Sequence, residues 1–289
     1  MDTLERLRVV TDIDDSQWQD LLQLTWWDYV MVRSGKKQLS EQALLRLSEY
    51  FDSDPRAVIT GKVDFHSIQI QSEKSRWEMP DAYAVANYGR RRTTITTFEY
   101  IERNHGWRLR YEVLKHLGLS ESILTDPFAP ISMQVITDAL AYLGHRHFTA
   151  KDFFAMGMYS YSGNVNTLLG RFYSELETSK EVIEHMWGDC LNFYEKNCRY
   201  RFLKLNEEGA LLEVSSDPHV AQEMETTHLG NEYICSLKAG MMASAPMYRG
   251  EAPAKVIERC CVHHGAPACV FEITFAKGVL YHAANLNFA

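Results

Sequence analysis

Four side chains that can bind a metal ion lie in the C-terminal part of the chain: Cys235, Glu258, Cys261 and Cys269. Three thiolates and one carboxylate can complete a four-coordinate shell around a divalent ion such as Zn²⁺. A shell closed in this way leaves no position for a reacting water, so the role predicted for the ion is structural. The spacing is not a repeated Cys-x-x-Cys pattern, and buried free thiols are the alternative that it leaves open. His263 or His264 could also replace Glu258, because imidazole is a common zinc ligand.

One helix and two strands would have to position these ligands. The run around Cys235 has helical spacing, whereas "AKVIERCCV" and "ACVFEITF" are typical of strands joined by the turn "HHGAP". Neighbouring residues of a strand point to opposite faces, so only one of Cys260 and Cys261 can face the ion. Glu258 and Cys261 are separated by an odd offset, which predicts a bulge or a strand end near Cys260.

Motifs of enzyme active sites are missing from the sequence. It contains no Gly-x-Ser-x-Gly elbow, no His-Glu-x-x-His helix, no dinucleotide fingerprint and no GxxxxGK[ST] phosphate loop. We therefore expect that the chain is not an enzyme. The basic run Arg90–Arg92 follows Gly89 and is interpreted either as a solvated turn or as a phosphate-binding site.

Composition excludes several classes of protein. The 289 residues are 46% apolar and 24% charged, as in globular proteins, and Asp and Glu outnumber Lys and Arg by 38 to 30. An acidic chain can bind nucleic acid only through a local basic patch. No apolar stretch approaches the ~20 residues of a membrane span, and no signal peptide is apparent. The expected location is the cytoplasm, where the six cysteines would stay reduced.

Helical periods dominate the first two-thirds of the chain, and strand periods follow. We predict a small all-α module over residues 1–64, a connector with some β character over 65–92, and an α+β domain over 93–289. Within that domain, a helix is predicted over 179–197. "YRFLKLNEEGALLEV" predicts a hairpin, and one more strand is predicted over 279–288.

The N-terminal run "VRSGKKQLSEQALLRLSEYFDSDPRAVITG" resembles part of a lambda-repressor-like helix-turn-helix. In the same module, Ser16 is the expected N-cap of a short helix over residues 16–22. The resemblance implies DNA binding, with Arg33, Lys36 and Lys37 as the candidate contacts. The recognition-helix position, "TWWDYVMVRSG", is mostly apolar, and residues 1–64 carry 12 acidic against 8 basic side chains. A degenerate module for dimerisation or docking is therefore the alternative.

The C-terminal run "LGNEYICSLKAGMM…GEAPAKVIERCCVHHGAPACVFEITF" resembles the 4-vinyl reductase domain family over about residues 180–276. Members of that family include the aromatic-hydrocarbon sensors of bacterial activators. The resemblance implies a structural Zn²⁺ within residues 230–276, bound by the four residues named above and next to an apolar ligand pocket. The residues expected to line this pocket are His185, Trp187, Phe193, Tyr194, Phe202, Tyr233 and Met241.

Together these features predict a cytoplasmic, homodimeric regulator that senses a small apolar or aromatic molecule and controls transcription. The alternative is an accessory or scaffold protein that does not bind DNA. In that case the same domain would bind a partner or a pigment-type intermediate.

Overall fold

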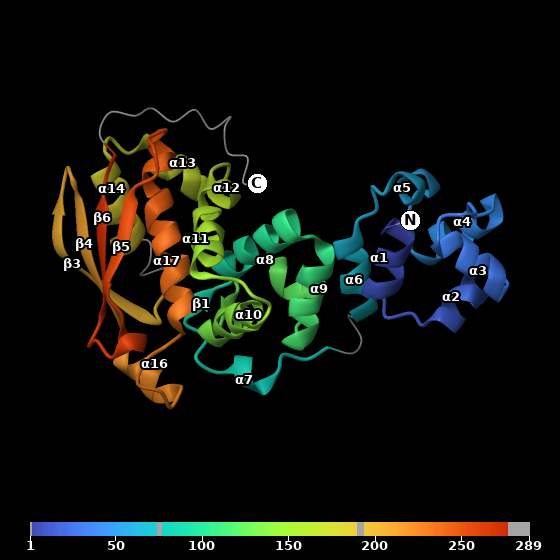
Figure 1. Cartoon of the computed structure of the whole chain (residues 1–289), viewed down its shortest axis with the longest axis horizontal. Coiled ribbons are helices and arrows are strands. Elements are labelled where there is room, and N and C mark those ends of the chain that lie inside the picture. Colours follow the sequence, from blue (N-terminus) through green and yellow to red (C-terminus); the bar gives the residue numbers. More distant parts are fainter. Residues whose placement is uncertain (1, 74–76, 190–193, 277–289) are drawn as a thin grey trace. The chain divides into compact units, whose positions relative to one another are not determined.

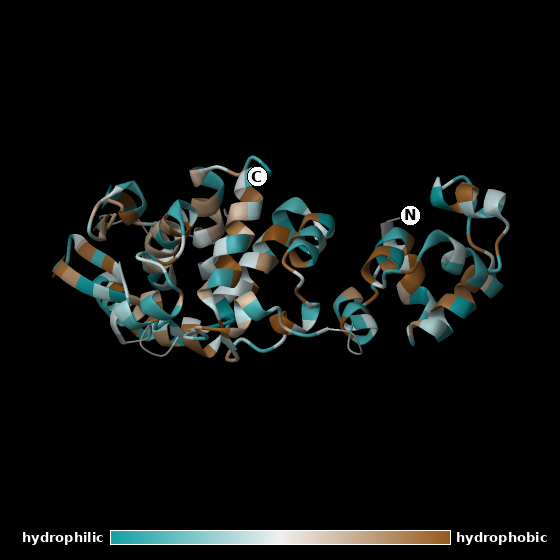
Figure 2. Cartoon of the chain, turned by 90° about the horizontal axis from the view of Figure 1, so that it is seen from below, coloured by the Kyte–Doolittle hydropathy of each residue, from teal (hydrophilic) through white to brown (hydrophobic). Residues whose placement is uncertain are grey.

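The computed structural model describes residues 2–73, 77–189 and 194–276, and it consists of helices and antiparallel strands (Figure 1). The α+β class expected from the sequence is therefore confirmed. The chain divides into two compact units, residues 1–78 with 120–122 and residues 79–119 with 123–289. Apolar and polar stretches alternate along the helices of both units (Figure 2), as expected where one face of each helix is buried.

Six helices form the first unit. They are α1 (Asp2–Val10), α2 (Asp15–Leu22), α3 (Trp26–Arg33), α4 (Glu41–Tyr50), α5 (Pro55–Thr60) and α6 (Phe65–Glu73). The N-cap of α2 is Asp14, whose carboxylate accepts from the Gln17 N–H at 2.8 Å while the Gln17 side chain accepts from the Asp14 N–H. This reciprocal capping box places Ser16 inside the helix, so its assignment as the cap was wrong.

Two segments of the first unit differ from the sequence-based prediction. Helix α1 was not predicted within the module over residues 1–64, and it buries Leu7 in the unit's core. The segment predicted as a β-like connector begins with helix α6, in which Phe65, Ile68 and Gln69 are buried. These positions follow helical spacing, and the Asp64 carboxylate accepts from the Ser67 N–H near the start of the helix. The local alternation around Ile68 was therefore misleading.

Helix α3 occupies the position expected for a recognition helix. It exposes three large apolar side chains, Trp26, Trp27 and Met31, and Trp27 is 73% accessible to solvent. Since apolar side chains cannot donate to or accept from base edges, this face lacks the chemistry of direct base readout.

The basic residues proposed for DNA binding lie at the end of α3 and after it. Arg33 pairs with Asp15 at 3.5 Å, and Lys37 pairs with Asp28 at 2.6 Å, while Lys36 is exposed. Two of the three positive charges are thus partly neutralised by carboxylates of the same unit.

Helices and a short ribbon make up the first part of the second unit. The helices are α7 (Asp81–Ala84), α8 (Arg92–His105), α9 (Trp107–His116), α10 (Met133–His145), α11 (Ala150–Met158), α12 (Ser160–Asn164), α13 (Leu168–Glu175), α14 (Ser179–Glu184), α16 (Pro218–Glu223) and α17 (Glu232–Ser244). The ribbon pairs β1 (Gly89–Arg90) with β2 (Pro130–Ile131).

A four-stranded antiparallel sheet completes the second unit. Its strands are β3 (Cys198–Asn206), β4 (Gly209–Ser216), β5 (Lys255–Cys260) and β6 (Cys269–Thr274), in the order β3-β4-β6-β5. The predicted hairpin β3–β4 and the two predicted C-terminal strands are confirmed. Gly209 begins β4 at a φ of 152°, where an added Cβ would lie 1.9 Å from the Ile273 carbonyl oxygen. Only glycine fits this crossing of neighbouring strands.

The predicted helix over residues 179–197 is much shorter in the structure. Helix α14 ends at Glu184, a π-helical turn follows over His185–Asp189, and β3 begins at Cys198. Residues 190–193 and the strand predicted over 279–288 lie outside the described residues. The apolar residues whose spacing suggested one long helix instead belong to α14 and to the turn, where Val182, Ile183 and Trp187 are buried.

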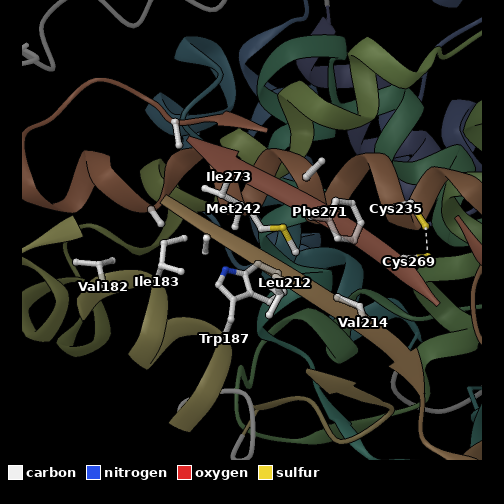
Figure 3. Close-up of a cluster of buried hydrophobic side chains, with 14 of the residues drawn as sticks. Val182, Ile183, Trp187, Leu212, Val214, Cys235, Met242, Cys269, Phe271 and Ile273 are labelled. Atoms are coloured by element: carbon white, nitrogen blue, oxygen red, sulfur yellow. Dashed lines mark hydrogen bonds between the residues drawn. The ribbon is translucent and has the colours of Figure 1, made fainter. Parts of the chain in front are cut away.

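Helix α17 packs along the sheet and forms the centre of the second unit's core (Figure 1). Figure 3 shows Met242 of α17 among Leu212 of β4, Phe271 of β6 and Trp187 of the π-helical turn. The other face of α17 packs against α11. Within the described residues, no helix is long and apolar enough to cross a membrane.

Candidate functional site

The four predicted metal ligands come together in the second unit. Cys235 projects from α17, Glu258 from β5, Cys261 from the turn after β5, and Cys269 from the first position of β6. Their ligand atoms all lie within 4.8 Å of one another, and we call this group the Cys₃Glu cluster. The Cys235 sulfur lies 3.6 Å from that of Cys269 (Figure 3) and 3.8 Å from that of Cys261.

A strand irregularity makes this arrangement possible. The pairing register between β5 and β6 shifts between Glu258 and Cys260, where the sequence predicted a bulge or a strand end. Cys260 is exposed and Cys261 is buried, so only one cysteine of the doublet faces the cluster. The shift therefore allows Glu258 and Cys261, three positions apart, to reach the same point.

The three thiols have different acidities. The hydrogen bond from Cys235 lowers the pKa of Cys269 to about 7, and the Val262 N–H also donates to the Cys269 sulfur. The same bond with Cys269, together with burial, raises the pKa of Cys235 far above its usual value. Burial raises the pKa of Cys261 to about 11. Near neutral pH the cluster thus combines one thiolate with two protonated thiols.

The histidines considered as alternative ligands lie outside the cluster. Neither His263 nor His264 belongs to the group of ligand atoms within 4.8 Å. The imidazole of His264 lies 3.4 Å from the Glu232 carboxylate. Glu258 is therefore the fourth ligand that the geometry offers.

A cavity of about 60 Å³ lies between α8, α10, α17 and β3, and we call it the first cavity. Its apolar lining comes from the helices and from β2, and includes Ile131, Met133, Ile136, Ile234, Leu237 and Met241. Its polar lining includes Trp187, Asn197, Tyr200, Lys238 and Glu195. The first cavity could therefore hold a small molecule that has an apolar part and a polar group.

Within the part of the chain that the structure describes, three polar atoms in this lining are buried without a hydrogen-bond partner. They are the indole Nε1 of Trp187, the Oδ1 of Asn197 and the hydroxyl oxygen of Tyr200. Trp187 is 2% exposed and Asn197 is 1% exposed, so solvent does not satisfy them from outside. The Asn197 amide nitrogen donates to the Glu195 carboxylate, which fixes Oδ1 as the unused acceptor.

Lys238 brings a positive charge to the first cavity. Its Nζ lies 3.1 Å from the Cys198 sulfur and 5.2 Å from the centre of the Tyr200 ring. Burial alone would lower the pKa of Lys238, but Cys198, Tyr200 and Glu195 outweigh burial and raise it well above its usual value. Burial also raises the pKa of Cys198 and of Tyr200, so both are neutral near pH 7 while Lys238 is charged.

A second cavity, of about 80 Å³, adjoins the first. The two share four lining residues, Arg90, Thr93, Tyr194 and Met241. Arg92 also lines the second cavity and donates to two neutral acceptors, the Asn164 Oδ1 at 2.5 Å and the Gly163 carbonyl at 2.7 Å.

The predicted pocket residues separate into three groups. Trp187, Tyr194 and Met241 line the first cavity. His185, Phe202 and Tyr233 line neither cavity: the His185 ring contacts Phe172, Phe202 packs against the apolar core, and the Tyr233 ring contacts Phe153 at 4.7 Å. Phe193 lies outside the described residues.

Sequence reasoning missed most of the polar lining. Asn197, Tyr200 and Lys238 were not singled out, although Lys238 interrupts the apolar run "ICSLKAGMM". It follows Ile234 by four positions, so on a helix it shares the face of that buried residue. A charged residue on this otherwise apolar helix face was the sequence signal that could have indicated the polar lining.

Comparisons with known proteins show a likeness of fold. No family model matches the chain, and no curated protein matches it. An H-NOX protein from S. oneidensis in the Fe(II) ligation state has a TM-score of 0.50, with 13% identity over 66% of this chain and 98% of that chain. An Fe(II) unliganded H-NOX protein from K. algicida has a TM-score of 0.46, with 12% identity over 66% and 98%. A structure described as probing haem distortion in the H-NOX family also has a TM-score of 0.46, with 14% identity over 67% and 100%.

These findings correct four predictions. The structures similar to this chain are H-NOX proteins, so the identification with the 4-vinyl reductase domain family was wrong. The predicted structural Zn²⁺ is also contradicted, because the similar H-NOX structure from S. oneidensis is described in an Fe(II) ligation state. The predicted zinc-containing, DNA-binding sensor of apolar or aromatic molecules combined that identification with the helix-turn-helix resemblance, and it is corrected too, as is the accessory or scaffold alternative.

Haem, which this fold family implies, does not fit either of the two cavities described above. They measure about 60 and 80 Å³, whereas pockets for drug-sized ligands, which are smaller than haem, measure ~300–1,000 Å³. Among the described residues, no histidine or cysteine lines either of the two cavities, although tyrosine and methionine do. The proximal imidazole typical of globin-type haem sites thus has no counterpart in this lining.

Proposed function

We propose that the second unit is a binding domain for a small polar molecule, and that its role is recognition rather than catalysis. The observation that carries the proposal is the convergence of the Trp187 indole N–H, the Asn197 Oδ1 and the Tyr200 hydroxyl on the first cavity, each buried and without a partner. The likeness to H-NOX proteins supports the fold alone.

The free-energy cost of unpartnered buried polar groups favours a bound molecule in the first cavity. Leaving one buried polar group without a hydrogen bond costs about 1–3 kcal/mol, so native proteins rarely do so. Three such groups around one cavity therefore favour a polar occupant that can bond to them. A ligand that accepts from Trp187 and donates to Asn197 would remove most of this cost. The groups also come from different segments, the π-helical turn and β3, so binding would stabilise their association.

The direct test is a thermal-shift screen of small polar fragments against the purified chain. We expect at least one fragment to raise the Tm of the wild type and to lose most of this effect in Trp187→Phe, which removes the indole N–H. Trp107→Phe is the matched control, because Trp107 lies in α9 and lines neither cavity. A screen without any stabilising fragment, or equal shifts in Trp187→Phe, would contradict the proposal.

For the Cys₃Glu cluster we propose a separate role as a site for one thiophilic metal ion. Support comes from the four ligand atoms within 4.8 Å of one another and from the three segments that they join. Thiolate ligands select soft metal ions, and a bound ion would connect α17 to β5 and β6. A reducing cytoplasm, the predicted location, would keep these thiols available.

Titration with Co²⁺ under reducing conditions tests this site by its thiolate-to-metal absorption. We expect one ion per chain in the wild type and in Cys260→Ser, since Cys260 is exposed. Cys269→Ser should lose the absorption or bind far more weakly. Equal binding by Cys269→Ser would remove the ligand assignment. A disulfide between Cys235 and Cys269 is the competing outcome, and alkylation without reductant, followed by mass measurement, would detect it.

A further inference from the structure

We infer that the ligand of the first cavity is a small zwitterion of the α-amino-acid class. Its ammonium group binds to Glu195 and Asn197, and its carboxylate binds at the other charge, beside Lys238. This inference rests on the proposed binding function and names its ligand class. It is argued from three features of the first cavity: the two opposite charges in its lining, the grouping of its acceptors and donors, and its size.

Two opposite charges line the first cavity, the ammonium group of Lys238 and the carboxylate of Glu195. Glu195 acts on Lys238 through its charge, but among the described residues no direct ion pair joins the two side chains. Arg90 lines the cavity as well, but it has an interaction of its own and serves here as no anchor. A simple anion would lie near the like charge of Glu195, and a simple cation near that of Lys238. A zwitterion can place an opposite charge at each.

The unused acceptors of the lining lie next to each other. Glu195 accepts from the backbone N–H and from the side-chain amide of Asn197, and both bonds end on Oε1. Its Oε2 is therefore left to accept from a ligand. The Asn197 Oδ1 belongs to the same amide group that contacts Glu195, and it is buried without a partner. An ammonium group has three donors, so it can bond to both oxygens at once.

Donors gather around the ring of Tyr200. The Lys238 Nζ lies 5.2 Å from the centre of this ring, and the centre of the Trp187 ring lies 5.4 Å from it. The Trp187 N–H is buried without a partner. A carboxylate has two oxygens, so it can accept from the Lys238 ammonium and from the Trp187 N–H together, and bonds between charged groups are the stronger ones.

Size restricts the ligand to the smallest amino acids. A water molecule needs about 10–15 Å³ of such volume, so a cavity of about 60 Å³ holds about four to six water-sized groups. Alanine, lactate and alaninamide have equal numbers of non-hydrogen atoms and the same branching, so they form a matched set of probes. In lactate a hydroxyl group replaces the ammonium group, and in alaninamide an amide replaces the carboxylate.

Calorimetry on the full chain measures the Kd of the three probes. A pH of about 6.5 lies below the ordinary α-amino pKa of about 7.7–8.0, so alaninamide is then mostly a cation. We expect alanine to bind at least about 10-fold more tightly than lactate and than alaninamide, because each analogue loses one charge-assisted contact. The indole N–H resonance of Trp187, assigned from its loss in Trp187→Phe, should shift on addition of alanine.

Two substitutions assign the two charges. Glu195→Gln should weaken the binding of alanine about 10-fold or more but should not weaken that of lactate, which has no ammonium group. Lys238→Met should weaken alanine and lactate but not alaninamide, which has no carboxylate. Glu184→Gln and Lys255→Met, at exposed positions of the same unit, are the controls and should leave all three affinities unchanged.

The outcomes separate the two proposals. If lactate or alaninamide binds to the wild type as tightly as alanine, the domain binds small molecules but the zwitterion inference is overturned. This comparison needs no variant, so it decides even where a substitution prevents folding. If Glu195→Gln weakens lactate as much as alanine, Glu195 does not hold the ammonium group and the inference is likewise overturned. If none of the probes binds while the fragment screen gives other ligands, only the inference is lost. If the fragment screen is also negative, the proposed function is lost with it.

Discussion

Individual side chains decide what each site of the second unit can bind. In the Cys₃Glu cluster, one sulfur is held as a thiolate by donors from Cys235 and Val262, while two others stay protonated. In the first cavity, Lys238 keeps its proton beside a neutral thiol and a neutral phenol. The cluster is therefore suited to a soft cation, and the cavity is suited to a small polar molecule.

Proton release gives the metal site a defined pH dependence. Between pH 8 and 9 the ion must displace protons from Cys235 and Cys261, whose pKa values are raised, whereas Cys269, with a pKa of about 7, is already mostly ionised. About two protons should leave per ion, so Co²⁺ affinity should rise about 100-fold per pH unit in this range. Below pH 7, Cys269 also becomes protonated, so Co²⁺ affinity should fall more steeply as the pH decreases.

Competition with a coloured chelator at pH 7, 8 and 9 measures this slope, after correction for the chelator's own protonation. Cys260→Ser serves as the control, because its thiol is exposed and outside the cluster. An affinity that stays constant over this range would mean that the thiols do not bind the ion as thiolates.

At the scale of elements, close packing of α17 against α11 allows α17 to reach both sites. Gly157 of α11 and Gly240 of α17 let the two backbones approach, since a Cβ at either position would lie 2.0 Å from a carbonyl oxygen of the other helix. Helix α17 supplies Cys235 to the cluster and Ile234, Leu237, Lys238 and Met241 to the first cavity. The position of α17 therefore affects the geometry of both the Cys₃Glu cluster and the first cavity.

The glycine contact predicts a large effect from one methyl group. Gly240→Ala should lower the free energy of unfolding by about 1–3 kcal/mol, because the added carbon meets the Phe154 carbonyl and the helices must separate. The ordinary helix preference for alanine, about 1 kcal/mol, is too small to offset a contact of this kind. Urea unfolding followed by circular dichroism measures the change.

Gly188→Ala is the matched control for this substitution. A Cβ at Gly188 would meet nothing within 4 Å, so its effect should stay within about 0.5 kcal/mol. Equal stability of Gly240→Ala and the wild type would mean that α11 and α17 are not packed as closely as described.

At the scale of the whole molecule, the chain consists of two units with separate cores. The core of the first unit includes Leu7, Trp18 and Leu47 of α1, α2 and α4, whereas the core of the second surrounds α17 and the sheet. Both candidate sites draw all their residues from the second unit. The homodimer expected from the sequence stays a prediction.

Separate cores predict separate stabilities. Leu47→Ala should destabilise the first unit by about 2–5 kcal/mol, because Leu47 is fully buried in that core. Co²⁺ binding by the second unit should be unchanged at temperatures where the variant's first unit is still folded. Calorimetry should show a lowered transition for one unit only. A parallel loss of Co²⁺ binding would show that the units fold as one.

The sequence was sufficient for features that depend on nearby residues. Alternation in "YRFLKLNEEGALLEV" predicted the β3–β4 hairpin, and the α+β class followed from the order of helical and strand periods. The odd offset from Glu258 to Cys261 indicated an irregularity near Cys260, and the register shift lies there. Such features are encoded locally, because strand alternation and turn residues act over a few positions.

Prediction from local patterns failed where contacts with segments distant in the sequence determine the structure. The alternation around Ile68 suggested a strand, but burial against the first unit's core makes α6 a helix. The lining of the first cavity shows the same limit, since Asn197, Tyr200 and Lys238 have no common spacing in the chain. Their meeting depends on how α17 packs on the sheet.

By itself, then, the sequence determined which residues could bind a metal ion and which segments are helices or strands in most of the chain. Only the tertiary structure decided that Lys238 lines the same cavity as Trp187, Asn197 and Tyr200, and that the two described cavities are too small for haem. The physical reason is that charge and volume in a cavity are set by side chains far apart in sequence, whose distances follow from packing alone.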